Sequence, residues 1–493
     1  MGDSRQIRGG AHGPAVAGAL VRAAHAAGTW RRRGVRVGRS GGTGVSDGNP
    51  MRRSVGGILK AAVAILLVCA GASAQESDEK LTARVAKIDD KFLPSLGDLA
   101  KKYDAEGNPE AAHFFAECAL SFGKSDSDLS ALKKKWETDL FLGKVRGGKL
   151  LEAVHPIKEA LRGPQAEYKK TLDEITASAR AGALTDTRRR ILHDCAVKYE
   201  ISRGAHEYIQ ATQRINEIRR GMGLRGLLWD AEASRRLILA GCYMADSADL
   251  ESKDAADSGQ KDNVFWSEAV DFAKKETGRI PYGEMLNAVD RLRSSALTRE
   301  DILNLDARRL WLGRWSDGRK IPAITLYRVS PVGYREDVPT PSRRYSSETV
   351  TQELKTWVDT EDSHLANGKK VAYVRYPFSD ESDVPRHFEG EHGWADSEGK
   401  FLAKAGTPIM VRFFADCVLK DVEVNLTDKS GRKIPWKLYR DGDKRVQFHV
   451  QRPTVLVVPE REFDKGMVYT ISIRCKVDDT PFEKQWSFTT RAK

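Results

Sequence analysis

Four side chains of the types that bind metal ions gather in one short stretch of the sequence, "HFEGEHGW". His387, Glu389, Glu391 and His392 lie within six consecutive residues. Imidazole nitrogens and carboxylate oxygens are both zinc ligands, and a zinc site commonly takes four such groups. The stretch falls in a predicted loop between strands, where a solvated polar turn is the alternative interpretation. Metal binding and a solvated turn both remain open for this stretch.

Two further groups of ligand-type residues fail on their spacing. His206 and Glu207 begin the helical zinc-protease pattern, but Gln210 stands where the second histidine is required. A solvated helix face is the interpretation that we favour there. His193 and Cys195 are two residues apart in a predicted helix, so they point to different sides and cannot easily hold one ion. The sequence carries no phosphate-cradling loop, nucleotide fingerprint or Cys-x-x-Cys pair, and we therefore expect no cofactor.

The charge of the chain argues against a nucleic-acid partner. The formal net charge is +12, with 40% hydrophobic and 30% charged residues among 493. Residues 1–50 hold eight arginines and two acidic residues, so half of that surplus comes from this leader. The remaining sequence is nearly balanced and shows no Lys/Arg stripe with interleaved aromatics. We expect no nucleic acid among the partners.

An export signal follows the leader. The segment "MRRSVGGILKAAVAILLVCAGASAQ", Met51 to Gln75, has a basic start, an apolar run and an Ala-Ser-Ala ending. This is the build of a secretory signal peptide, and the apolar run is short for a spanning helix. We therefore predict cleavage near Ala74, no transmembrane helix in the mature chain, and a secreted, periplasmic or envelope location. Residues 1–50 are then a disordered or mis-called upstream extension, and Met1 and Met51 remain alternative starts.

The cysteines permit a disulfide but do not define the fold. Five cysteines follow Ala74, which is an odd number in a long chain. Exported proteins can form disulfides. Cys417 and Cys475 fall in one predicted β region, and they are the candidate pair.

The elements that must position these residues divide the chain into an α part and a β part. Residues 79–205 show helical periodicity throughout, with a helix predicted to end near Asp104, a Gly-Asn-Pro turn and a second helix behind it. Two apolar runs flank Ser316-Asp317-Gly318 and predict a β-hairpin. A linker with a short helix is expected at 331–367. From residue 368 onward alternating apolar positions predict a β-sandwich, with Trp486 and Phe488 on its core side.

One passage, "INEIRRGMGLRGLLWDAEASRRLILAGCYMA", combines a helix, a glycine loop, an apolar-Trp-Asp turn and a helix ending in Met-Ala. Its matching positions include Ile215, Asn216, Arg219, Gly223, Trp229, Asp230, Met244 and Ala245. "PYGEM" and "LTREDILNLDARRLWLGRW" follow in order. The passage resembles the entry to the CAP superfamily of cysteine-rich secretory, antigen 5 and pathogenesis-related 1 proteins. The likeness spans about residues 207–329 and implies an α-β-α sandwich.

The resemblance also implies a central cleft, in which metal-binding members of the family use two histidines and two glutamates. In this chain the position of the first histidine corresponds to Ala240 or Gly241, and the position of the second corresponds to Thr298, so neither histidine is present. Two carboxylates without imidazoles make a poor zinc site, so we expect no metal in the cleft. Glu284 matches the glutamate of the family's Gly-Glu turn, and capping of a helix or turn is the alternative role of this residue. The resemblance leaves four possible cleft residues: Glu251, Glu284, Thr298 and Arg299.

The C-terminal part resembles the bacterial Ig-like domains of secreted and surface-layer proteins. "YPFSDESDVP", "VVPEREFDKGMVYTISI" and "WSFTT" carry this likeness. Such domains are usually spacers or adhesive modules, and the resemblance adds no catalytic residue.

Together these features predict a multidomain α+β protein: a helical region at 79–205, a degenerate CAP-like domain at 206–330, a linker at 331–367 and an Ig-like sandwich at 368–493. We expect an exported, non-catalytic binding or adhesion module at the cell envelope or outside the cell. Its partner is a small ligand, a lipid or an envelope or extracellular protein. The alternatives are a hydrolase that uses a carboxylate pair in the CAP cleft, and a structural envelope scaffold.

Overall fold

The computed structural model describes residues 76–141, 151–180, 184–246, 307–315, 324–330, 363–366, 369–387, 405–413, 417–439 and 453–492, with residues 265, 278–281, 285, 289, 290, 293, 299, 302 and 303 between them. All of these residues belong to one compact unit, Glu76–Lys493. The predicted extension at 1–50 and the predicted signal peptide at 51–74 lie outside the described residues.

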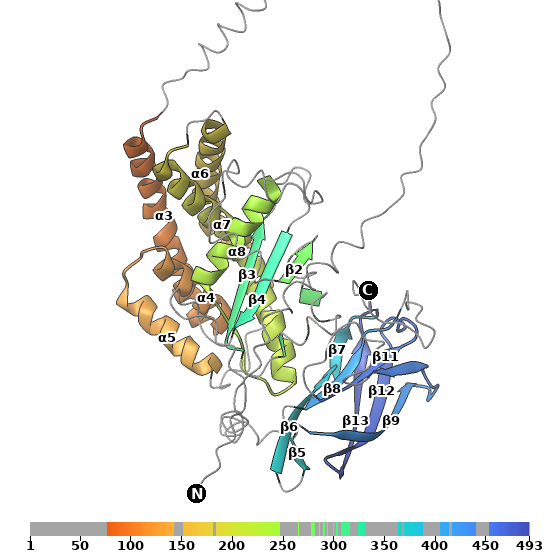
Figure 1. The fold of residues 1–493 in the computed structure, drawn as a ribbon. Helices are drawn as coiled ribbons and strands as arrows, with labels where there is room; N and C mark the ends of the chain where they lie inside the picture. Colours follow the sequence, from red (N-terminus) through yellow and green to blue (C-terminus); the bar gives the residue numbers. More distant parts are fainter. Residues whose placement is uncertain are drawn as a thin grey trace, which may run out of the picture. The chain divides into compact units, whose positions relative to one another are not determined.

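Helices make up the first part of the described chain (Figure 1). They are α3 (Asp78–Ala105), α4 (Pro109–Ser121), α5 (Ser127–Phe141), α6 (His155–Arg180), α7 (Asp186–Gly221) and, after a short strand, α8 (Ala231–Asp246). Polar side chains cap the starts of α3, α4 and α7, among others, because Ser77, Asn108 and Thr185 each accept a hydrogen bond from a backbone N–H of the first turn. The predicted helix, turn and helix around residue 104 are confirmed.

Helix α4 lies at the centre of the helical part. Every residue from Pro109 to Ala119 is buried, whereas the sequence pattern indicates only one apolar face. The helix contacts α3, α5, α7, α8 and the strand β1 (Leu228–Trp229). Its polar side chains are therefore held inside the protein, where each needs a partner.

Helix α7 continues across the predicted boundary between the helical region and the CAP-like region. The boundary at residue 205 falls in the middle of this 36-residue helix. One hydrophobic cluster contains residues of α3, α4, α6, α7, α8 and the sheet that follows. The helical region and the α/β region thus share both a helix and a core.

A four-stranded sheet follows, with the order β1-β3-β4-β2. Its other strands are β2 (Gly278–Pro281), β3 (Arg309–Trp315) and β4 (Ile324–Ser330). Strand β1 runs parallel to β3, while β3 and β4 pair antiparallel along their full length, from Arg309 opposite Ser330 to Trp315 opposite Ile324. The predicted hairpin pairing is confirmed.

Strand β3 lies between two helices, because neighbouring residues of a strand point to opposite faces. On one face Gly313 packs against α8, so closely that an added Cβ would collide with the backbone of Leu237 and Ile238. On the other face Arg314 pairs with Glu207 of α7. Helices therefore cover both faces of this strand (Figure 1).

The edge of β3 beyond the two-residue strand β1 is completed by side chains. Leu312 N donates to Ser234 Oγ of α8 at 3.1 Å, and Arg314 N donates to Tyr208 Oη of α7 at 3.0 Å. Both hydroxyl-bearing side chains are fully buried. These bonds satisfy the backbone N–H groups of Leu312 and Arg314, which lie beyond the end of the short partner strand β1.

The C-terminal part is a β-sandwich of two sheets. The first sheet has the order β10-β11-β8-β6-β5 and the second has the order β7-β13-β12-β9. Their strands are β5 (Ser363–Ala366), β6 (Lys369–Tyr376), β7 (Glu381–Val384), β8 (Ile409–Phe413), β9 (Leu419–Asp428), β10 (Trp436–Tyr439), β11 (Thr454–Pro459), β12 (Val468–Val477) and β13 (Thr480–Thr490). The predicted sandwich is confirmed, and its first strand, β5, lies inside the stretch that we predicted as a linker. The short helix predicted near residues 350–358 is outside the described residues.

The central strands β8 and β11 of the five-stranded sheet are buried on both faces. One face joins the second sheet in a core that includes Val411, Val457, Trp486 and Phe488. The opposite face belongs to the same hydrophobic cluster as the helices, through Val374, Tyr376, Met410, Leu456 and Val458. Every residue of β8 and β11 is accordingly buried. The sandwich thus shares a hydrophobic cluster with the helices of the same unit.

No helix among the described residues is long and apolar enough to cross a membrane.

Candidate functional site

The polar residues that carry the CAP resemblance bind the backbone of neighbouring segments. Asn216 is fully buried, and its amide donates to Leu227 O at 3.0 Å and accepts from Leu227 N at 2.6 Å. Arg219, also fully buried, donates to Arg225 O at 2.7 Å and to Ile302 O at 2.5 Å. Burial lowers the pKa of Arg219 to about 9. Both residues position the backbone, and neither faces an open site.

The glycine loop and the Trp-Asp turn have structural roles as well. Gly223 has a φ of +75°, and Leu224 N donates to Arg219 O at 2.8 Å. This arrangement ends α7 as a Schellman motif, for which glycine is the favoured residue. The ring of Trp229 packs 4.4 Å from that of Phe114, while Asp230 caps α8 by accepting from Ala233 N at 3.0 Å. The passage is therefore scaffold throughout its described contacts.

Of the four residues predicted to line the cleft, the structure describes one. Glu251, Glu284 and Thr298 lie outside the described residues. Arg299 is fully buried, and its guanidinium carbon lies 3.8 Å from the centroid of the Tyr376 ring in β6. It donates to Arg293 O and to Pro408 O, each at 2.8 Å. Arg299 thus connects the α/β part with the sandwich.

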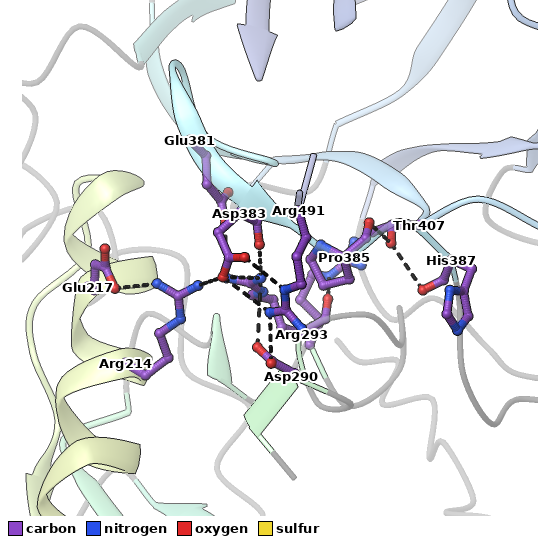
Figure 2. A network of polar contacts seen from close by, with 11 residues as sticks. Arg214, Glu217, Asp290, Arg293, Glu381, Asp383, Pro385, His387, Thr407 and Arg491 are labelled. Carbon is purple, nitrogen blue, oxygen red and sulfur yellow. Dashed lines mark hydrogen bonds and ion pairs between the residues drawn. The ribbon is translucent and has the colours of Figure 1, made fainter. Parts of the chain in front are cut away.

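A network of charged residues surrounds this connection (Figure 2). Arg293 is fully buried and donates to Glu381 Oε1 at 3.4 Å and to the backbone oxygen of Asp383. Its guanidinium also lies 3.7 Å from a carboxylate oxygen of Asp290. Glu381 and Asp383 belong to β7, so the network joins Asp290 and Arg293 to the edge of the sandwich.

Asp383 is the centre of the exposed side of this network. Its carboxylate accepts from Arg214 at 2.6 Å and from Arg491 at 2.7 and 3.1 Å, as Figure 2 shows. Arg491 also reaches Asp290 at 2.8 Å, and Arg214 pairs with Glu217 on its own helix. Partial burial acts to raise the pKa of Asp383, but its hydrogen bond to Arg491 and the nearby guanidinium charges hold that pKa below its usual value. The carboxylate therefore stays ionised at neutral pH.

Glu381 is the buried member of the network. Its side chain is 2% exposed, and burial raises its pKa to about 7 against the opposing charge of Arg293 and a hydrogen bond from Phe378 N. A carboxyl group with such a pKa can hold or release a proton near neutral pH, which is the property of a general acid or base. Here its neighbours are guanidinium groups and backbone. Its protonation state therefore affects the joint, by which we mean the contacts of Arg293 and Arg299 with the sandwich.

The predicted solvated face at His206 and Glu207 is wrong. Both side chains are largely covered, with 14% and 18% of their surface exposed. Glu207 pairs with Arg314 of β3, beside the fully buried Glu200. Burial lowers the pKa of His206 to about 4, so this imidazole is neutral at neutral pH. The helix face lies against the sheet because α7 covers β3.

The stretch of ligand types at 387–392 is described only at its first member. His387 is exposed, and its Nδ1 lies 3.3 Å from Glu462 Oε1. In Figure 2 its backbone oxygen accepts from Thr407, which also bonds the backbone of Pro385. Glu389, Glu391 and His392 are outside the described residues, and the metal site considered for this stretch stays a prediction.

No disulfide joins Cys417 to Cys475 in the structure. Cys475 lies inside the sandwich core, and Cys417 packs against the margin of the same core. Both side chains contribute to this core, and the pairing considered from the sequence stays a prediction.

A different group of ligand types comes together among the described residues: His113, Glu117 and Glu137. His113 and Glu117 are one helical turn apart in α4, a spacing that the sequence shows and that we did not single out. Glu137 comes from α5, and its approach depends on tertiary packing.

Comparisons with known proteins leave the family open. No family model matches the chain, and no curated protein matches it. Among solved structures, CopC from Methylosinus trichosporium OB3b is similar at 14% identity over 24% of this chain and 88% of that one, with a TM-score of 0.16. The N-terminal part of the bacterial S-layer protein SbsC is similar at 10% identity over 83% of this chain and 79% of that one, with a TM-score of 0.15. A structure of SbsC domains 1–6 gives 10% identity over 83% and 46%, again with a TM-score of 0.15. At TM-scores this low, none of the three carries an argument about fold or function.

Proposed function

We propose that this chain is an exported, non-catalytic protein of the cell envelope or the extracellular space, and that its α/β part and its β-sandwich act together as one binding module. The observation that carries the proposal is the burial of Arg299 in contact with the sandwich. Arg299, one of the four possible cleft residues, is fully buried and contacts Tyr376 and Pro408 of the sandwich.

A degenerate CAP-like scaffold is part of this proposal. Its support is the order of elements: α7, a glycine loop, β1 with Trp229, α8 and then β3 and β4. The resemblance implies that order, and it also implies helices on both faces of the sheet. Strand β3 has α8 against Gly313 and α7 against Arg314.

The chemistry of the described polar clusters favours binding over catalysis. The buried charges of Arg293 and Glu381 are paired with each other at the joint to the sandwich. A catalytic carboxylate needs access to a substrate as well as a shifted pKa, and Glu381 is 2% exposed. The hydrolase alternative rests on Glu251 and Glu284, which lie outside the described residues.

The surface of the sandwich favours a polar partner over a lipid. On the outer face of the second sheet, Lys476 pairs with Asp421 at 2.7 Å and Arg474 pairs with Glu483 at 2.8 Å. Among the described residues, only Val418 and Val468 are large exposed hydrophobics. Insertion into a bilayer needs a contiguous apolar face, so we propose an envelope or extracellular macromolecule with polar groups as the partner.

The test begins with the location and the mature end of the protein. The full chain with an epitope tag after Lys493 is expressed in its native host, and cells are separated into cytoplasmic, envelope and medium fractions. We expect the tagged protein in the envelope or medium, with a mature N-terminus near Gln75. Recovery of the uncleaved chain from the cytoplasm would contradict the proposal.

Catalysis is tested on the same purified protein. We expect no turnover of peptide or lipid-ester substrates above the level of a Glu284→Gln variant. Hydrolysis by the wild type that is lost in a folded Glu284→Gln variant would establish the hydrolase alternative. Chemical cross-linking in intact cells then identifies the partner, with a tagged unrelated exported protein as the control.

A further inference from the structure

A buried histidine and two glutamates come together in the helical part, at positions distant in sequence from Arg293 and Arg299 of the joint. His113 and Glu117 project from the same side of α4, and Glu137 approaches from α5. One ligand atom from each lies within 4.8 Å of the other two. His113 is 1% exposed and Glu117 is 6% exposed, so water reaches this group of atoms poorly.

The imidazole lacks a hydrogen bond on the side that faces the carboxylates. His113 Nε2 is buried without a hydrogen-bond partner. Its nearest anionic oxygen is Glu137 Oε1 at 3.8 Å, which is too long for a hydrogen bond. Buried polar atoms in native proteins are nearly always satisfied, and an exception often marks an ion or a water molecule. The open nitrogen points at the place where the carboxylates gather.

The distances suit a single small cation. Two ligand atoms at about 2.1 Å from one tetrahedral ion are about 3.4 Å apart. The separation between His113 and Glu137 is 3.8 Å, and all three ligand atoms lie within 4.8 Å of one another, so rotations of the two glutamate side chains would bring the set to this geometry. The types of ligand select the ion, because imidazole nitrogen with carboxylate oxygen suits zinc and its neighbours better than magnesium or calcium.

The charges around the cluster leave room for the ion once one lysine moves. Glu117 pairs with Lys133 Nζ at 2.6 Å, and Glu137 pairs with Arg309 at 2.9 Å. The Lys133 side chain is 29% exposed, and its flexible stem lets the ammonium group swing into water. Arg309 is anchored at the start of β3. The nearby His113 and Arg309, working against burial, lower the pKa of Glu137 to about 2, so this ligand is ionised.

We propose that His113, Glu117 and Glu137 bind one divalent transition-metal ion of the zinc class, in exchange for the ammonium group of Lys133. The ion links α4 to α5 and, through Glu137 and Arg309, to the first residue of β3. This site is independent of the proposed binding function, since it uses none of the residues of the joint with the sandwich.

The experiment uses the mature chain without a histidine tag, stripped with a chelator and titrated with Zn²⁺ by calorimetry and by competition with a chromophoric chelator. Co²⁺ in place of Zn²⁺ gives visible absorption bands that report the coordination geometry. We expect one site per chain in the wild type and at least tenfold weaker binding in His113→Ala and Glu137→Gln.

Two control variants make the assignment specific. His155 and Glu159 also stand one turn apart, 3.2 Å from each other, but they are exposed, and among the described residues no third ligand-type side chain joins them. His155→Ala should bind as the wild type does. A His387→Ala/His392→Ala variant removes the histidines of the loop at 387–392, and it should retain the site.

Lys133→Ala keeps the proposal testable even if the ligand variants fold poorly. Without its competitor the site should bind Zn²⁺ several-fold more tightly than the wild type does. The proposal is overturned if the wild type shows no saturable binding, if His113→Ala binds like His155→Ala, or if Lys133→Ala leaves the affinity unchanged. In those cases the three residues form an ion-pair network only.

Discussion

Replacing Arg299 by alanine tests whether this side chain is a structural clamp or a ligand-binding group. The substitution removes hydrogen bonds to two backbone oxygens, at Arg293 and Pro408, and the guanidinium that lies 3.8 Å from the Tyr376 ring centroid. It also leaves both oxygens without this donor in a place where water does not reach, since Arg299 is fully buried.

The expected loss of stability follows from these contacts. A hydrogen bond from a charged donor contributes about 1.5 to 3 kcal/mol, and a desolvated cation over an aromatic ring contributes about 2 kcal/mol. Contributions within one cluster are not additive. We therefore expect the free energy of unfolding to fall by about 4 kcal/mol, within the range of about 3 to 5 kcal/mol for a broken buried charge interaction.

The assay is urea unfolding of the mature chain, followed by circular dichroism and by hydrogen exchange with mass spectrometry. Exchange reports separately on α7 and on β12, and protection should fall in both when Arg299 is replaced. Arg474→Ala is the matched control, because its partner Glu483 is exposed on the outer face of the sandwich. An exposed pair of this kind contributes at most about 1 kcal/mol.

Two results would refute the reasoning about Arg299. A loss below about 1 kcal/mol, no larger than in Arg474→Ala, would show that the clamp does not hold the parts together. A stable variant that no longer captures the cross-linked partner would make Arg299 a ligand-binding residue.

Three more substitutions test other contacts by the same unfolding assay. Glu381→Gln should remove a pH dependence of stability. The pKa of Glu381 is about 7 in the folded protein and 4.5 for a free glutamate, so the native wild type binds an extra proton between these pH values. The wild type should therefore lose about 3 kcal/mol of stability, relative to the variant, as the pH rises from 4.5 to 7. Gly313→Ala should destabilise by about 1 to 3 kcal/mol, because its methyl group would collide with α8 at Leu237. Asn216→Ala should lower stability by about 2 to 3 kcal/mol, because both backbone polar groups of Leu227 lose their partner.

Matched controls separate these effects from substitution in general. Glu423→Gln changes an exposed carboxylate of β9, and its stability should follow the pH dependence of the wild type. Gly163→Ala adds a methyl group to open space in α6 and should stabilise. Asn425→Ala alters an exposed side chain and should change stability by less than about 0.5 kcal/mol. Equal effects in Gly313→Ala and Gly163→Ala, or in the two asparagine variants, would contradict the packing described here.

Local sequence patterns predicted the elements well where one residue type decides the backbone. Pro109 at the start of α4 and Gly223 at the end of α7 mark helix boundaries by their own φ preference. The alternation that places Trp486 and Phe488 in one core is likewise a property of a single strand. These signals need no information from the rest of the chain.

Tertiary contacts decided the features that sequence patterns missed. Periodicity assigns one apolar face to α4, but the helix is covered on all sides, so its His113 and Glu117 are inside. Arg293 and Glu381 meet across 88 positions of sequence, and nothing in either neighbourhood predicts the other. The contact of Arg299 with Tyr376 is not predictable from local sequence for the same reason, because this ring belongs to the sandwich.

The burial of β8 and β11 on both faces has a consequence for how the chain folds. The helices and the α/β part emerge first, and the face that they offer to Met410, Leu456 and Val458 stays open until the C-terminal strands arrive. A partly folded chain with such a face is prone to aggregation. Arg491 then ties β7 to Asp290. Removal of Arg491 should therefore leave a chain that associates with others before it can fold.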